Sequence, residues 1–164
     1  MKVYIASIFS DKDRVAARAE ELKADGIEST MRWCYETAPH NCTITDFPDE
    51  YFRETAVFDL EDIIAADKLV MLVPTDKQMA DQTLRAMARG GRHFEAGFMY
   101  ALAMMNPNKY ELVIVGPREN VFHFLDGQSV TSKFPTIRQF DTWEECRSYL
   151  KASIPVVYIK GEIA

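Results

Sequence analysis

The sequence predicts an α/β fold in which one parallel sheet of five strands is covered by helices on both faces. Short apolar runs typical of strands alternate with helix-like segments five times, without internal repeats or low-complexity stretches. Strands that are joined through helices run parallel, and the helices then cover both faces of the sheet. Five strands favour the doubly wound, flavodoxin-like order 2-1-3-4-5, because 164 residues are too few for an eight-stranded barrel.

The chain begins with a predicted strand and helix. Residues 2–7, KVYIAS, are mostly apolar and rich in β-formers, which indicates a buried strand. Ser10 and Asp13 have the spacing of a capping box, and they predict a helix that ends at Gly26. Residues 27–35, IESTMRWCY, then predict the second strand.

A long loop and a long helix precede the third strand. Residues 36–47 are polar and form a longer connection than most, and loops of that length are often functional. Pro48 suits a first helical position, and residues 49–67 have an amphipathic pattern. The uninterrupted apolar run at 68–74, KLVMLVP, predicts a strand that is covered on both faces.

The second half of the chain continues the alternation. Residues 75–92 are polar and ambiguous, with a helical turn expected at 81–88. The remaining predicted elements are a helix at 93–105, a strand at 110–116, a short helix at 119–125, a strand near 136–140 and a final helix at 141–151, which Thr142 and Glu145 begin with a capping-box pattern. We therefore expect one α/β domain over 1–152, with 153–164 as an added edge strand or an arm that reaches a neighbouring subunit.

Composition and charge exclude several classes of protein. A formal net charge of −6 argues against binding of a nucleic-acid polymer through its phosphates. The short apolar run at the N-terminus matches neither a signal peptide nor a membrane span. An odd number of scattered cysteines indicates a reducing, cytoplasmic setting, and no second ligand pair with zinc-like spacing follows the nearest candidates. The cysteines are Cys34, Cys42 and Cys146, and the metal candidates are His40 and Cys42 together with Cys34. We expect neither a metal nor a cofactor.

In doubly wound sheets, ligands bind outside the carboxyl ends of the strands, at the point where the strand order reverses. Two segments of this chain follow strands at that point. One is the turn after the first strand, which begins at Ser7. The other is ARGGRHFE, residues 88–95, between the third strand and its helix. We expect the site there.

The second segment suits a negative charge. Gly90 and Gly91 allow close backbone approach, and the free N–H groups and dipole of a helix start favour anions. Arg89 and Arg92 add charged donors, and Glu95 is expected in the first helical turn. The segment therefore either binds an anion such as phosphate or keeps Glu95 ionised as a nucleophile or electrostatic stabiliser. The alternative is a glutamate that only complements the helix dipole.

A second acid comes from FDLEDIIAAD, residues 58–67. Asp59 lies beside Phe58, whereas Glu61 and Asp62 are expected on a solvated face. The alternative for Asp59 is a surface residue that contributes only solubility.

These motifs, taken in order, point to a family. The chain resembles the nucleoside 2-deoxyribosyltransferase-like superfamily, which also contains deoxynucleoside-monophosphate N-glycosidases. The resemblance covers most of residues 2–125 and rests on the ordered set VYIAS, DLEDIIAAD, GGRHFEAGFMYAL and VGPRENVFHF.

The resemblance implies two catalytic residues. Glu95 would attack the anomeric carbon and form a covalent deoxyribosyl-enzyme, and Asp59 would contact the departing base and help to protonate it. The helix start is expected to keep Glu95 ionised, and apolar surroundings or the base itself to keep Asp59 protonated. A second base that accepts the sugar gives transfer, and water gives hydrolysis.

The resemblance also implies the substrate-binding residues. Tyr4 matches an aromatic near the sugar and the glutamate, and Gly91 with its neighbours matches the loop at the sugar's 5′ side. Asn120 matches a side chain that reaches the 5′ group in a neighbouring subunit, so a homo-oligomer is expected. His93 either contacts the 5′ group or caps the helix. Ser7, Gly90 and Arg92 complete the predicted set.

The choice of substrate stays open between two patterns. Transferases of the family carry another acid shortly before the catalytic glutamate, whereas here residues 85–93 read RAMARGGRH and favour a 5′-phosphorylated substrate. The N-glycosidase members instead favour serine in their phosphate loops. We expect deoxyribosyl transfer between bases, on deoxynucleosides or their monophosphates. Hydrolysis of monophosphates and non-catalytic nucleotide binding are the alternatives.

Overall fold

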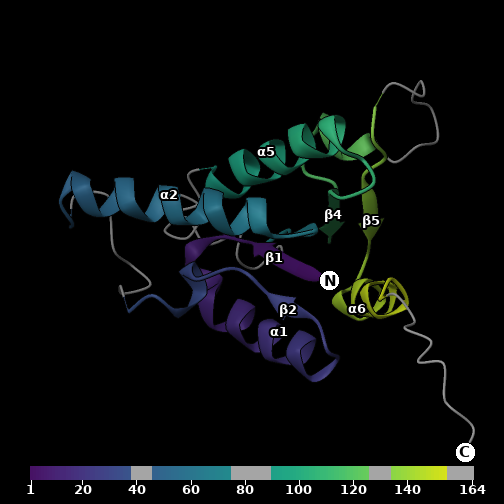
Figure 1. The fold of residues 1–164 in the computed structure, drawn as a ribbon, viewed down its shortest axis with the longest axis horizontal. Coiled ribbons are helices and arrows are strands. Elements are labelled where there is room, and N and C mark those ends of the chain that lie inside the picture. Colours follow the sequence, from purple (N-terminus) through teal and green to yellow (C-terminus); the bar gives the residue numbers. More distant parts are fainter. Residues whose placement is uncertain (38–45, 75–89, 126–133, 155–164) are drawn as a thin grey trace, which may run out of the picture.

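A computed structural model describes residues 1–37, 46–74, 90–125 and 134–154 (Figure 1). The sheet has five parallel strands in the order β2-β1-β3-β4-β5, which confirms the predicted class and the flavodoxin-like strand order. The strands are β1 (Lys2–Ala6), β2 (Glu28–Ser29), β3 (Lys68–Leu72), β4 (Glu111–Val115) and β5 (Arg138–Phe140).

Helices cover both faces of this sheet. Figure 1 shows α1 and α6 below the sheet and α2 and α5 above it. The helices are α1 (Lys12–Ala24), α2 (Asp49–Ala65), α5 (Gly91–Met105) and α6 (Trp143–Ala152), with short 3-10 turns η1 (Phe9–Asp11), η2 (Trp33–Tyr35) and η3 (Val121–Phe124). Within the described ranges, none of these helices has the length and apolar character needed to cross a membrane.

The core lies along the three central strands. Val3 to Ala6 of β1 and Leu69 to Met71 of β3 are fully buried, because helices pack on both sides of them. Each fully buried aliphatic side chain contributes roughly 1.5–3 kcal/mol. The carboxyl ends of these rigid central strands therefore give a fixed base for a site.

Several predicted boundaries hold. Gly26 has a φ of 77° and follows the end of α1, as the sequence predicts. Thr142 and Glu145 form the predicted capping box at the start of α6. The turn expected at 81–88 and most of the tail at 153–164 lie outside the described residues.

The second strand is much shorter than predicted. Of residues 27–35, only Glu28–Ser29 form a strand, which pairs with β1 at the edge of the sheet. The chain then leaves the sheet, because the Arg32 N–H donates to the Asp62 carboxylate and the Trp33 indole donates to the Ile5 carbonyl. These tertiary contacts override a strand-like pattern.

The capping box predicted at Ser10 and Asp13 is wrong. The chain first forms η1, and α1 begins at Lys12 with Asp11 at the N-cap position. The Asp11 carboxylate accepts a hydrogen bond from Ser7 and pairs with Arg14. The short helix predicted at 119–125 is likewise only the 3-10 turn η3.

Candidate functional site

A cavity of about 250 Å³ opens beyond the carboxyl end of β1, next to the point where the strand order reverses between β1 and β3. The turn after β1, the turn η2, helix α2 and the start of α5 form its walls. Its lining residues are Ser7, Ile8, Phe9, Trp33, Thr55, Asp59, Gly90, Gly91, Arg92 and Glu95. The cavity therefore lies where the sequence places the site.

The structure brings both predicted acids to this cavity. Asp59 comes from α2 and Glu95 from α5, together with the predicted Ser7, Gly90, Gly91 and Arg92. Tyr4, in the central strand β1, contacts one of these acids, since its hydroxyl donates a hydrogen bond to Glu95 Oε1 at 3.1 Å.

The carboxyl group of Glu95 binds its proton more tightly than a glutamate in water does. Its half-buried carboxyl has a pKa raised from 4.5 to about 8, first because burial removes water and then because the charge of Asp59 is near. The hydrogen bond from Tyr4 opposes the shift. The pKa of Tyr4 is itself strongly raised, chiefly by burial and then by the charge of Glu95.

The expectation that the helix start keeps Glu95 ionised is wrong, since its pKa is raised to about 8. Helix α5 begins at Gly91, two residues earlier than predicted, after Gly90 adopts a left-handed φ of 85°. Glu95 is therefore the fifth helical residue and lies beyond the first turn, within which the dipole effect falls off. Burial outweighs what remains of that effect.

Asp59 has the raised pKa that the sequence predicts. Its value rises from 3.8 to about 7, first through burial and then through the charges of Glu36 and Asp62. Tyr4 and Arg32 oppose the shift. Both acids in the cavity thus hold protons more tightly than in water, so the two environments are alike rather than opposed.

An ion pair that the sequence did not predict fixes the position of Asp59. Asp62, expected on a solvated face, is only 6% exposed and accepts hydrogen bonds from the Arg32 N–H and Nε at 2.9 Å. Arg32 Nη2 also donates to the Phe58 carbonyl at 3.0 Å, and the guanidinium lies over the Phe58 ring. Arg32 therefore anchors the helical turn that carries Asp59.

Two aromatic residues also line the cavity, of which one lies in the turn predicted to border the site and the other was not predicted. Phe9 follows the end of β1 and Trp33 lies in η2, with ring centroids 6.4 Å apart. The Trp33 indole N–H donates to the Ile5 carbonyl at 3.1 Å, which holds the ring in place. Such rings offer flat apolar surface next to the two acids. The position of Phe9 just after the first strand was the signal available in the sequence, whereas Trp33 fell within the predicted second strand.

Arg92 is not a free cation in this structure. Its side chain is buried, and Nη2 donates to Glu119 Oε1 at 2.7 Å. Much of its charge is therefore neutralised before any anion arrives, which weakens the expectation that it binds a phosphate on its own.

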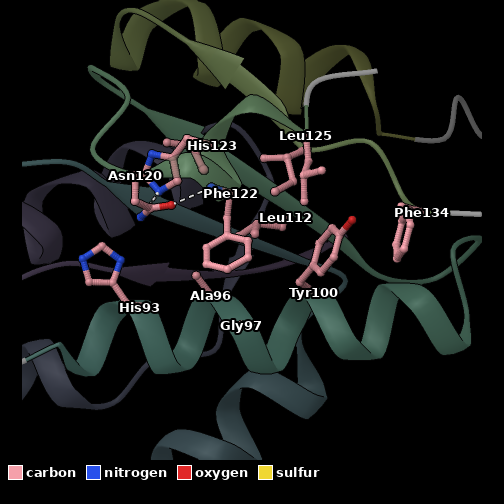
Figure 2. Close-up of a pocket in the computed structure, with 12 residues that line it drawn as sticks. His93, Ala96, Gly97, Tyr100, Leu112, Asn120, Phe122, His123, Leu125 and Phe134 are labelled. Carbon is pink, nitrogen blue, oxygen red and sulfur yellow. Dashed lines mark hydrogen bonds between the residues drawn. The ribbon is translucent and has the colours of Figure 1, made fainter. Parts of the chain in front are cut away.

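The two remaining predicted residues, His93 and Asn120, line a different and larger cleft of about 790 Å³ (Figure 2). His93 and Glu95 are two positions apart on α5, so their side chains point about 200° apart around the helix. The cleft is lined mainly by apolar side chains from α5, β4 and η3, including Tyr100 and Phe122. His93 and Asn120 thus do not meet Glu95 within one chain.

Comparison of the chain with protein-family models, with curated proteins and with solved structures found no match. What the site does chemically therefore rests on its own geometry and on the motifs of the sequence.

Proposed function

We propose that this protein breaks the N-glycosidic bond of a 2′-deoxynucleoside or its 5′-monophosphate and transfers the deoxyribosyl group to another base. The observation that carries the proposal is the pair of carboxyl groups, Glu95 and Asp59, facing one small cavity. Retaining cleavage of a glycosidic bond uses such a pair, one as nucleophile and one as proton donor. The family resemblance gives the same two residues these roles.

In the first step, a Glu95 oxygen forms a bond to C1′ while the bond from C1′ to the base nitrogen breaks. The electron pair of that bond goes to the base, which takes a proton from Asp59. In the second step, a nitrogen of the incoming base attacks C1′, the ester to Glu95 breaks, and Asp59 takes the proton that the incoming base releases. The carboxylate of Glu95 also stabilises the positive charge that develops on the sugar.

This reaction needs one proton on the pair of acids, on Asp59. The two raised pKa values, about 7 for Asp59 and about 8 for Glu95, describe a coupled pair that loses its protons around neutral pH. Activity should rise with pH as the first proton leaves and fall as the second leaves. We therefore expect a bell-shaped profile of kcat/KM with its maximum between about pH 7 and 8.

Hydrolysis of a deoxynucleoside monophosphate is the second candidate, since the basic segment before Glu95 favours a phosphorylated substrate. In that case water attacks C1′ in the second step and Asp59 takes its proton. Incubation with a deoxynucleoside and a foreign base, and separately with each deoxynucleoside monophosphate, distinguishes the two. An exchanged nucleoside indicates transfer, and a free base from the monophosphate indicates hydrolysis. Binding without either product would contradict both and leave a nucleotide-binding module.

Variants of the two acids test the assignment of roles. Glu95→Ala should reduce turnover to background and abolish the covalent deoxyribosyl adduct that mass spectrometry detects in the wild-type protein. Asp59→Asn should slow the reaction at least about 100-fold, and less with bases that leave without protonation. Glu54→Gln, an exposed change on the same helix as Asp59, is the matched control. Full turnover by Glu95→Ala would overturn the mechanism.

Asn120 is proposed to serve the site of a neighbouring subunit, as the resemblance implies. The separation of Asn120 from the cavity that holds Glu95 supports this, because the side chain lines the cleft beyond α5. Light scattering should find an oligomer, and an active monomer would contradict this role for Asn120.

A further inference from the structure

Three potential metal ligands converge at the polar end of the larger cleft. His93 lies near the start of α5, Glu119 follows β4, and His123 lies in η3 (Figure 2 shows the two histidines). One ring nitrogen of each histidine and one oxygen of Glu119 all lie within 4.8 Å of one another. Neither the two-acid cavity nor the proposed reaction uses this group of side chains.

One oxygen of the Glu119 carboxylate accepts a hydrogen bond, and the other is directed toward His93. Arg92 Nη2 donates to Oε1, whereas Oε2 lies 3.8 Å from His93 Nε2. Oε2 is also buried without a hydrogen-bond partner in the part of the chain that the structure describes. Burying an unpaired carboxylate oxygen is costly, so this atom lacks a partner that a cation would supply. Arg92 then acts as the outer-shell group that orients a ligating carboxylate.

The ring of His123 is fixed on both sides. It is 4% exposed, the Glu119 N–H donates to Nδ1 at 3.2 Å, and Asn120 Nδ2 lies 3.1 Å from Nε2. A neutral imidazole has one lone pair to offer, so it cannot accept from both of these donors. When one ring nitrogen of His123 binds a metal, it loses its hydrogen bond, and the contact of the other nitrogen keeps the ring in place.

The third side chain has the freedom to complete the site. The His93 side chain is 39% exposed, so its ring can rotate toward Glu119. Bonds of about 2.0–2.1 Å to nitrogen and oxygen place tetrahedral ligand atoms roughly 3.3 Å apart. The present separation of 3.8 Å between His93 Nε2 and Glu119 Oε2 is close to that value.

We propose that His93, Glu119 and His123 bind a divalent transition metal ion of the zinc class. Two imidazoles and one carboxylate suit Zn²⁺ and its neighbours, whereas Mg²⁺ and Ca²⁺ require oxygen ligands. Three protein ligands leave a coordination position for an exchangeable water. Two of the three ligands, His93 and His123, line a cleft of about 790 Å³, which is large enough for a small apolar molecule to approach the ion.

Cobalt titration tests the proposal, since Co²⁺ in a site of four or five ligands absorbs visible light. Untagged protein is stripped with a chelator, dialysed and titrated with Co²⁺, and Zn²⁺ is then added to displace it. We expect one Co²⁺ per chain and loss of the colour with Zn²⁺. Zn²⁺ should also raise the thermal unfolding temperature, because it binds only the folded protein.

Adjacent variants on α5 separate this site from other ligands in the chain. His93→Ala should weaken Co²⁺ binding at least about 10-fold, whereas the neighbouring Phe94→Ala should leave it unchanged, since both side chains are exposed and tolerate removal. His123→Gln gives a second test, with circular dichroism as the check that it folds. The absence of a Co²⁺ spectrum, or equal affinity in His93→Ala and Phe94→Ala, would overturn the proposal. Neither result depends on the transferase reaction.

Discussion

Replacing Glu95 by glutamine should stabilise the fold, and the gain should grow as pH rises. The substitution keeps the shape of the side chain but removes the charge that burial disfavours. The folded protein holds the Glu95 proton with a pKa of about 8, whereas the unfolded chain releases it near 4.5. Between these two values the folded state binds more protons, so the free energy of unfolding of the wild type falls as pH rises.

The structure sets the size of this effect. A pKa raised from 4.5 to about 8 corresponds to at most about 5 kcal/mol of lost stability above pH 8. Glu95 is only half-buried and lines an open cavity, so water screens its charge and reduces the loss to about 2 kcal/mol. The glutamine variant does not lose this stability, because it carries no titrating group at this position.

Urea unfolding from pH 5 to pH 9 measures the difference directly. With a slope of about 2 kcal/mol per molar urea, the midpoint of the variant should exceed that of the wild type by roughly 1 M at pH 9. The gap should close toward pH 5. Glu54→Gln, whose side chain is exposed in the folded protein, should show no such trend. A difference between Glu95→Gln and wild type that does not change with pH would refute the reasoning.

Two further substitutions test the surroundings of the acids. Tyr4→Phe removes the hydroxyl that lowers the pKa of both Glu95 and Asp59, so both limbs of the activity profile should move to higher pH; unmoved limbs would contradict the role of Tyr4. Arg32→Ala leaves the buried Asp62 without its guanidinium and should cost about 1–3 kcal/mol in urea unfolding. Arg53→Ala, which removes only exposed ion pairs, should cost less than about 1 kcal/mol, and equal losses would count against an anchoring role.

The architecture could be predicted from the sequence because it depends on local periodicity. Apolar runs such as 68–74 and the amphipathic pattern of 49–67 mark their elements without reference to any distant residue. The length of the second strand was predicted wrongly for the opposite reason, because it depends on distant residues. Residues after Ser29 are drawn from the sheet edge by contacts of Arg32 and Trp33 with parts of the chain far away in sequence.

The site shows the same division between local and distant information. The rule that ligands bind where strand order reverses was enough to select the turn at Ser7 and the segment that contains Glu95. It could not reveal that Arg92 is paired with Glu119, 27 residues away, or that the partner of Asp62 is 30 residues away. Ion pairs of this kind decide which charges remain available, and no spacing rule predicts them.

The hydroxyl of Tyr4 is better placed than the start of α5 to decide which of the two acids carries the charge. It lowers the pKa of both Glu95 and Asp59, yet a hydroxyl has a single proton and donates to one carboxylate at a time. In this structure it donates to Glu95, so it favours the ionised form of Glu95 and opposes the effect of burial there. Even with that hydrogen bond in place, the pKa of Glu95 is about 8 and that of Asp59 is about 7, so Glu95 is still the slightly weaker acid. The positive charge that develops at C1′ in the proposed reaction would offset a difference of that size, because it acts on Glu95 at the distance of a forming bond.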